Sequence, residues 1–122
     1  MSKLHLSPYV NFQGRAKEAM EFYRHVLGGK VDLQEHDGRV AMARLDADGA
    51  TIVGTDGHPD YPAKAGENVA IAASGPEAEH MMKVFHGLAE GGQAKMAPSD
   101  QSPVGYLVDK FGINWVVRIE NA

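Results

Sequence analysis

Hydrophobic and polar residues alternate strictly at the start of the chain. Every second residue of this stretch is apolar or proline: Leu4, Leu6, Pro8, Val10 and Phe12. A period of two is typical of a β-strand with one buried and one polar face. The alternation therefore predicts a strand over residues 4–12, with its apolar face in the core.

The period changes from two to that of a helix at Arg15. Apolar residues now recur three or four positions apart: Ala16, Ala19, Met20, Tyr23, Val26 and Leu27. This stripe predicts a helix over residues 15–27 that ends at Gly28-Gly29, since glycine tolerates the left-handed conformation at a helix C-terminus.

Three further strands are predicted after this helix, at about 30–36, 39–46 and 50–55. The pairs Asp37-Gly38 and Asp48-Gly49 separate them, and such pairs favour tight hairpin turns. Residues 58–66 are rich in proline and glycine and are interpreted as a connecting loop.

The same order of patterns then starts again. A strand is predicted at 68–73 and a helix at about 76–90, with Ser74 as N-cap, Pro76 in the first turn and Glu77 closing a capping box. Gly91-Gly92 ends this helix. The last three strands are predicted at about 93–97, 103–109 and 112–119.

The two halves match at a constant offset of 63 residues. This offset pairs Phe22 with Phe85, Gly28-Gly29 with Gly91-Gly92, Asp46 with Asp109, Gly49 with Gly112, and Val53 with Val116. Most matches fall on helix ends and hairpin turns, where the backbone requires glycine or aspartate. We therefore predict a single α+β domain over residues 1–122, built from two βαβββ modules at about 3–57 and 66–120.

Several short motifs follow one another in a characteristic order. They are Pro8-Tyr9-Val10-Asn11-Phe12, Ala19-Met20-Glu21-Phe22-Tyr23, Leu27-Gly28-Gly29, Leu88-Ala89-Glu90-Gly91-Gly92 and Asp109-Lys110-Phe111-Gly112-Ile113-Asn114-Trp115. In these the chain resembles the vicinal oxygen chelate superfamily (glyoxalase I, bleomycin-resistance proteins and extradiol dioxygenases), most closely its PhnB-like, 3-demethylubiquinone methyltransferase-like branch. The resemblance implies a cupped eight-stranded mixed sheet, a ligand inside the cup and a homodimer.

Composition excludes several classes of function. The net charge is −4, with acidic and basic residues interspersed, so no basic face for nucleic acid is expected. No apolar run approaches the roughly 20 residues that span a bilayer, and the first residues lack the apolar segment of a secretory signal. The chain has no cysteine, which excludes disulfides and thiolate metal sites. A cytoplasmic protein is expected.

Metal chemistry is not expected. The resemblance implies that metal-using relatives draw ligands from the first and last strands of each module, near Ser7, Val53, Asn68 and Val116. Valine offers no donor atom to a metal. Shifting the alignment by two residues within a strand would replace Ser7 with His5 and so supply only one good ligand. His58 and Asp60 lack a third ligand. No glycine-rich nucleotide loop supports the methyltransferase label. We predict neither metal nor other cofactor.

Alternation along the last strand divides a core face from a ligand face. Ile113, Trp115, Val117 and Ile119 should pack beneath a helix, and Asn114 and Arg118 should point into the cup. The predicted ligand-binding residues are Tyr9, Asn11, Asn68, Asn114 and Arg118. The Tyr9 hydroxyl is a candidate acid or hydrogen-bond donor.

These residues favour binding of a small polar or anionic organic molecule without a metal. Two alternatives remain open at this point: a metal-dependent lyase, isomerase or dioxygenase, and a drug-sequestering resistance protein. The residues do not decide whether any reaction is catalysed.

Overall fold

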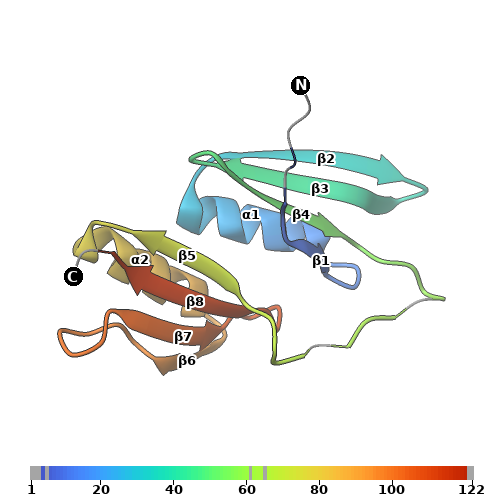
Figure 1. Cartoon of the computed structure of the whole chain (residues 1–122). Coiled ribbons are helices and arrows are strands. Elements are labelled where there is room, and N and C mark those ends of the chain that lie inside the picture. The colour runs from blue at the N-terminus through green and yellow to red at the C-terminus, as the bar shows by residue number, and fades with distance from the viewer. Residues whose placement is uncertain (1–3, 5, 61, 65, 121–122) are drawn as a thin grey trace. The chain divides into compact units, whose positions relative to one another are not determined.

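The chain folds into two compact units with the same order of elements. The computed structural model describes residues 4, 6–60, 62–64 and 66–120. The units are Met1–Ala63 and Lys64–Ala122, which we call module 1 and module 2. Each contains the order βαβββ, and the eight strands form two four-stranded mixed sheets (Figure 1). The predicted α+β architecture of two βαβββ modules is confirmed.

Module 1 begins with the short strand β1 (Tyr9–Asn11) and the helix α1 (Ala16–Leu27). The strands β2 (Lys30–His36), β3 (Arg39–Ala47) and β4 (Ala50–Thr55) follow. The strand order in the sheet is β1-β4-β3-β2, so the first and last strands of the module are neighbours and run parallel.

Module 2 repeats this arrangement. It consists of β5 (Ile71–Gly75), α2 (Ala78–Ala89), β6 (Gln93–Met96), β7 (Val104–Val108) and β8 (Asn114–Ile119). The strand order is β5-β8-β7-β6, and β5 runs parallel to β8. Within the described residues, no helix is long and apolar enough to cross a membrane.

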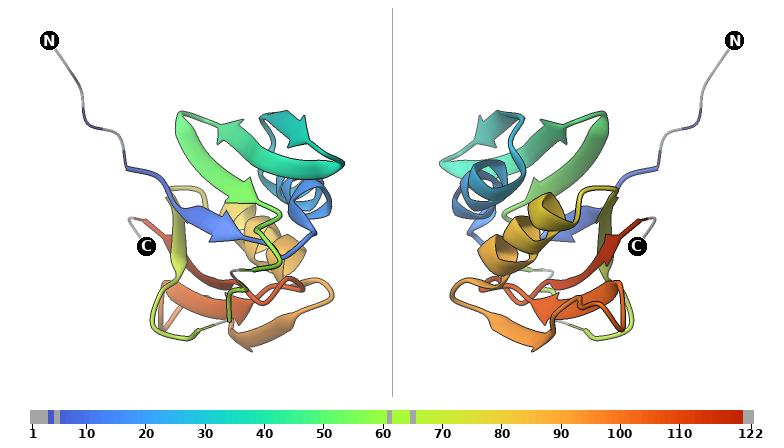
Figure 2. Two further views of the ribbon diagram at one scale, coloured as in Figure 1. Left: turned by 90° about the vertical axis from the view of Figure 1, so that its right-hand side faces the viewer. Right: turned by 90° about the vertical axis from the view of Figure 1, so that its left-hand side faces the viewer.

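In each module the helix covers one face of its own sheet (Figure 2). The largest fully buried side chains of module 1 are Tyr23, Met20 and Leu45, and those of module 2 are Trp115, Phe85, Leu88, Leu107 and Val117. The predicted division of β8 into two faces is confirmed, because Trp115, Val117 and Ile119 are buried while Arg118 is exposed. Each sheet therefore has one core face and one open face.

The repeat has two offsets rather than one. β4 and β8 correspond at 63, with Ile52 and Trp115 both buried, but α1 and α2 begin and end 62 residues apart. The buried residue of α1 that corresponds to Phe85 of α2 is consequently Tyr23, not Phe22. β3 and β7 also correspond at 62, so Asp46 matches Val108. A Cβ added at Gly29 would meet the Asp46 carbonyl, and one added at Gly92 would meet that of Val108.

The start of the second helix differs from the prediction. Ser74 lies in β5, where it pairs with Arg118, and α2 begins only at Ala78. Glu77 is the N-cap and makes no side-chain capping bond. The predicted capping box is therefore wrong. The parallel ladder with β8 continues through Gly75, so the residue after Ser74 is still in the strand and cannot form the first turn of the helix.

The first strand of each module starts later than predicted. Regular structure begins at Tyr9 in module 1 and at Ile71 in module 2, so Asn68 precedes its strand. Leu4 and Leu6 are 86% and 87% exposed, against the expectation that the apolar face of residues 4–12 is buried. Only Phe12 on that face is buried. The reason is that β1 pairs with β4 over three residues only.

Candidate functional site

The open face of the module 1 sheet carries polar side chains around an aliphatic centre. Tyr9 pairs with Val53, and Val53 pairs with Arg44 on its other side. Residues paired across neighbouring strands point to the same face, so these three form one row. Asn11 follows on the same face, two residues after Tyr9. Tyr9 is 66% exposed.

A carboxylate organises part of this face. Asp46 accepts hydrogen bonds from the Thr51 hydroxyl at 2.7 Å and from Arg44 Nε at 2.9 Å. These interactions hold the pKa of Asp46 below its ordinary value, and the Thr51 hydrogen bond contributes most. Arg44 is thus already partnered by a carboxylate, which reduces its capacity to attract an anionic ligand.

The open face of the module 2 sheet is more apolar but carries an exposed cation. Val116 pairs with Ala72 on one side and with Tyr106 on the other, and Tyr106 is 46% exposed. Arg118 stands two residues after Val116 and pairs with Ser74. Within the described part of the chain, Arg118 makes no ion pair. Its guanidinium is therefore the stronger candidate for an anionic group.

Asn114 has a structural contact that the sequence did not reveal. Its Nδ2 donates to the carbonyl oxygens of Gly66 at 2.7 Å and Val69 at 3.0 Å. The side chain thereby holds the segment before β5 against the start of β8. Asn68 lies exposed within this segment.

The predicted ligand-binding residues fall into two groups. Tyr9 and Asn11 share the open face of module 1, and Asn114 and Arg118 share that of module 2, while Asn68 precedes β5. Their convergence on a single cavity stays a prediction. His5, the alternative metal donor, lies outside the described residues.

The register of the strands changes the positions at which metal ligands were expected. Val53 lies beside Tyr9 and Val116 beside Ala72, rather than beside Ser7 and Asn68. No imidazole or carboxylate is present among the four residues at these paired positions, Tyr9, Val53, Ala72 and Val116. Across the residues that the structure describes, no group of three His, Asp or Glu side chains is placed to hold a metal.

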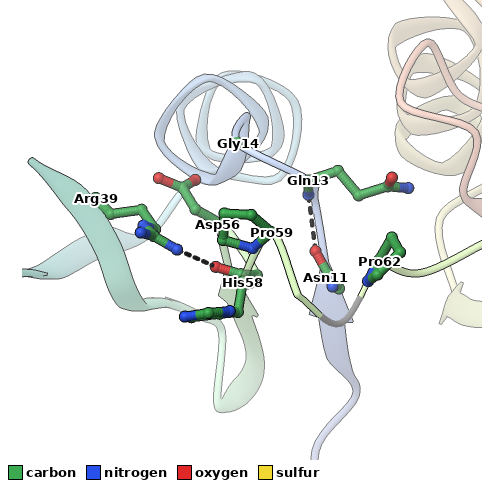
Figure 3. Close-up of a pocket in the computed structure, with 9 residues that line it drawn as sticks. Asn11, Gln13, Gly14, Arg39, Asp56, His58, Pro59 and Pro62 are labelled. Carbon is green, nitrogen blue, oxygen red and sulfur yellow. Dashed lines mark hydrogen bonds between the residues drawn. The ribbon is translucent and has the colours of Figure 1, made fainter.

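A pocket of about 430 Å³ in module 1 was not foreseen (Figure 3). It is lined by the end of β1, the turn after it, Arg39 at the start of β3, and residues 56–59 with Pro62 after β4. The breaker-rich composition of 58–66 signalled a loop here. Nothing in the linear sequence indicated that Arg39 lies beside it.

Comparisons with known proteins place the chain in a family. A model described as 3-demethylubiquinone-9 3-methyltransferase matches residues 4–118. Protein YjdN of Escherichia coli is 23% identical, and the match covers 93% of this chain and 94% of YjdN.

Solved structures agree with this assignment. Protein PA1353 from Pseudomonas aeruginosa is 27% identical with a TM-score of 0.86, and the match covers 97% of this chain and 98% of that one. A PhnB protein from Bacillus cereus (22% identical, TM-score 0.73, covering 95% and 99%) shares the fold. So does the fosfomycin resistance protein FosX from Listeria monocytogenes (13%, 0.69, covering 99% and 94%). The chain therefore belongs to the 3-demethylubiquinone-9 3-methyltransferase family, and it shares the fold of the PhnB and FosX structures.

Proposed function

We propose that this protein binds a small polar or anionic organic molecule on the open sheet faces, without a metal. Arg118 carries the proposal. It is exposed on β8, opposite the buried Trp115, and makes no ion pair within the described residues. On the same face of module 2, Tyr106 and Val116 would add an apolar surface and Asn114 a carbonyl oxygen; on its own open face, module 1 would offer the hydrogen-bonding groups of Tyr9 and Asn11. A few polar groups on an apolar lining are typical of small-molecule sites.

The rival activities have less support. Val53 and Val116 stand at the centres of the open faces, where a metal-dependent enzyme would require donor atoms. Sequestration of a cationic drug would be opposed by Arg118. The turn from β1 to α1 contains a single glycine, Gly14, so the family description does not lead us to propose methyl transfer.

A thermal-melt screen against small carboxylates, sulfonates and neutral analogues tests the proposal. A ligand that binds only the folded protein stabilises it by about 2.7 kcal/mol at 100 times its Kd. We expect anionic compounds to raise Tm and Arg118→Gln to remove the effect. Arg24→Gln on α1 is the matched control, since Arg24 is paired with Glu21 away from the sheet. Anionic compounds that still raise the Tm of Arg118→Gln contradict the proposal. So does the finding of about one tightly held transition metal per chain.

We also propose that two copies associate along the β1 edge of the module 1 sheet. Leu4 and Leu6 are exposed beside this edge strand, and an edge with exposed apolar residues is a template for pairing. Sedimentation at micromolar concentration should give twice the 13.1 kDa of one chain. Leu4→Ser with Leu6→Ser should shift the protein to monomer. A wild-type monomer would contradict this.

A further inference from the structure

The pocket in module 1 adjoins the open face of its sheet and shares Asn11 with it. It lies where the parallel strands β1 and β4 end, beside the turn that leads into α1 (Figure 3). Asn11 alone among the predicted ligand-binding residues lines it. The carboxyl ends of neighbouring parallel strands are a common place for ligands, because the connections diverge there and leave a crevice.

Asp56 in the pocket wall has a structural task that occupies both of its carboxylate oxygens. Oδ1 accepts a hydrogen bond from the backbone N–H of Ala16 at 2.9 Å, at the first residue of α1. Oδ2 accepts one from the N–H of Val40 at 2.8 Å. The carboxylate therefore compensates the positive end of α1 and ties this helix to β3 and β4.

Arg39, by contrast, is held without a carboxylate partner. Its half-buried side chain donates to the carbonyl oxygen of Gly57 at 3.4 Å, a long hydrogen bond. Within the described ranges it makes no ion pair. A guanidinium presents five N–H groups, so most of Arg39's donors remain for a ligand.

Asn11 is oriented so that a second donor is available. Its Oδ1 accepts the backbone N–H of Gln13 at 2.8 Å, and this contact supports the left-handed backbone of Gln13 at φ 52°. Gly57, at φ 79°, leaves room for this amide, because a Cβ there would come within 2.5 Å of Oδ1. The Nδ2 group makes no hydrogen bond within the residues described. The local backbone thus fixes a free amide donor at the pocket.

The remaining wall is rigid and largely apolar. Pro59 and Pro62 present rings whose backbone φ is fixed, so little entropy is lost when a ligand packs on them. His58 Nδ1 accepts the backbone N–H of Asp60 at 3.1 Å, which ties the side chain to the loop after β4.

We propose that this pocket is a second binding site, specific for a small organic molecule that carries a carboxylate or a phosphate. The oxyanion lies against the Arg39 guanidinium, with Asn11 Nδ2 as an additional donor, and the organic part packs on Pro59 and Pro62. The volume of about 430 Å³ is far larger than a bare ion needs and falls within the range of organic ligand sites. This site goes beyond the function proposed above and does not depend on it.

The test is an NMR titration of the wild-type protein with benzoate, phenyl phosphate and the neutral analogue benzamide. We expect saturable shifts of the Arg39 Nε–H and Asn11 side-chain amide signals with at least one anion, at millimolar concentration. Benzamide should bind about tenfold more weakly or worse. The tighter of the two anions identifies the ligand as a carboxylate or a phosphate. Equal binding of benzamide, or no saturable shift with either anion up to about 20 mM, would overturn the proposal.

Two variants separate this site from the open sheet faces. Arg39→Gln should weaken anion binding at least about tenfold, while Arg118→Gln should leave it unchanged. The reverse should hold for hits of the thermal-melt screen that bind at Arg118. Wild-type affinity in a folded Arg39→Gln protein overturns the second site alone. If Arg39→Gln does not fold, the comparison of benzoate with benzamide on wild-type protein decides.

Discussion

The hairpins β3–β4 and β7–β8 are equivalent in the repeat but turn in different ways. In module 1, Ala47 pairs with Ala50 and only Asp48 and Gly49 lie between them. Both have positive φ, 52° and 84°, as a tight two-residue turn requires. In module 2, Val108 pairs with Asn114, so residues 109–113 form a longer loop. The module 1 turn therefore needs little more than the backbone preferences of two residues.

The longer loop of module 2 depends on a buried carboxylate instead. Asp109 is 2% exposed and accepts hydrogen bonds from the backbone N–H groups of Phe111 at 2.8 Å and Ile113 at 3.1 Å. Its other oxygen accepts the indole N–H of Trp115 at 2.8 Å. The loop is thereby bonded to the largest side chain of the core. The two-residue turn is determined by backbone preferences, whereas the longer loop gains its conformation from side-chain hydrogen bonds to the buried Asp109.

The largest effect is expected where the long loop meets the core. Trp115→Ala removes a fully buried aromatic side chain and should lower the free energy of unfolding by about 3–5 kcal/mol, measured by chemical denaturation. Asn114→Ala, one residue earlier, is the control: its amide donates at a half-exposed position that water can reach, so it should cost only about 0.5–1.5 kcal/mol. The opposite order would mean that β8 does not present Trp115 to the core.

A smaller effect should distinguish the two aspartates that the 63-residue offset pairs. Asp109→Ala leaves backbone N–H groups and the Trp115 indole without their buried acceptor, which should cost about 1–3 kcal/mol. Asp46→Ala should lower Tm much less, because Asp46 is partly exposed and its partners can be solvated. Thermal unfolding of both variants checks this. Equal losses would indicate that the two hairpins are stabilised alike.

The smallest effect concerns the pKa of Asp46. Thr51→Val removes the hydroxyl that contributes most to the lowered pKa, so this pKa should rise toward its ordinary value in an NMR titration. A carboxyl group whose pKa is lower in the folded than in the unfolded state stabilises the folded protein at pH values above the unfolded-state pKa. This stabilisation is lost as the pH falls through the folded-state pKa. Thr51→Val should therefore lose less stability on acidification than wild type. Thr55→Val, whose hydroxyl contacts the Val40 carbonyl, should leave Asp46 unchanged.

The open faces of the two sheets also differ, and this difference was only partly predictable. The core face of β8 followed from alternation, because period two assigns Trp115 and Val117 to one side. On the module 1 sheet Arg44 forms an ion pair with Asp46, whereas on the module 2 sheet Arg118 has no described carboxylate partner. This difference depends on the neighbours of each arginine across the strands. The pattern along one strand does not specify its neighbours' register.

Local chemistry determined much of this protein. Apolar periodicity placed both helices to within two residues, and Asp-Gly pairs placed the hairpins of module 1, because these features depend on residues close in sequence. Tertiary structure alone decided the two repeat offsets, because the longer loop of module 2 shifts β7 against β8. It also decided that β5 extends through Ser74, because pairing with β8 outweighs the preference of this residue for a helix cap. It also brought Arg39 beside the segment after β4. That contact arises from strand pairing between residues distant in sequence, which no local pattern records.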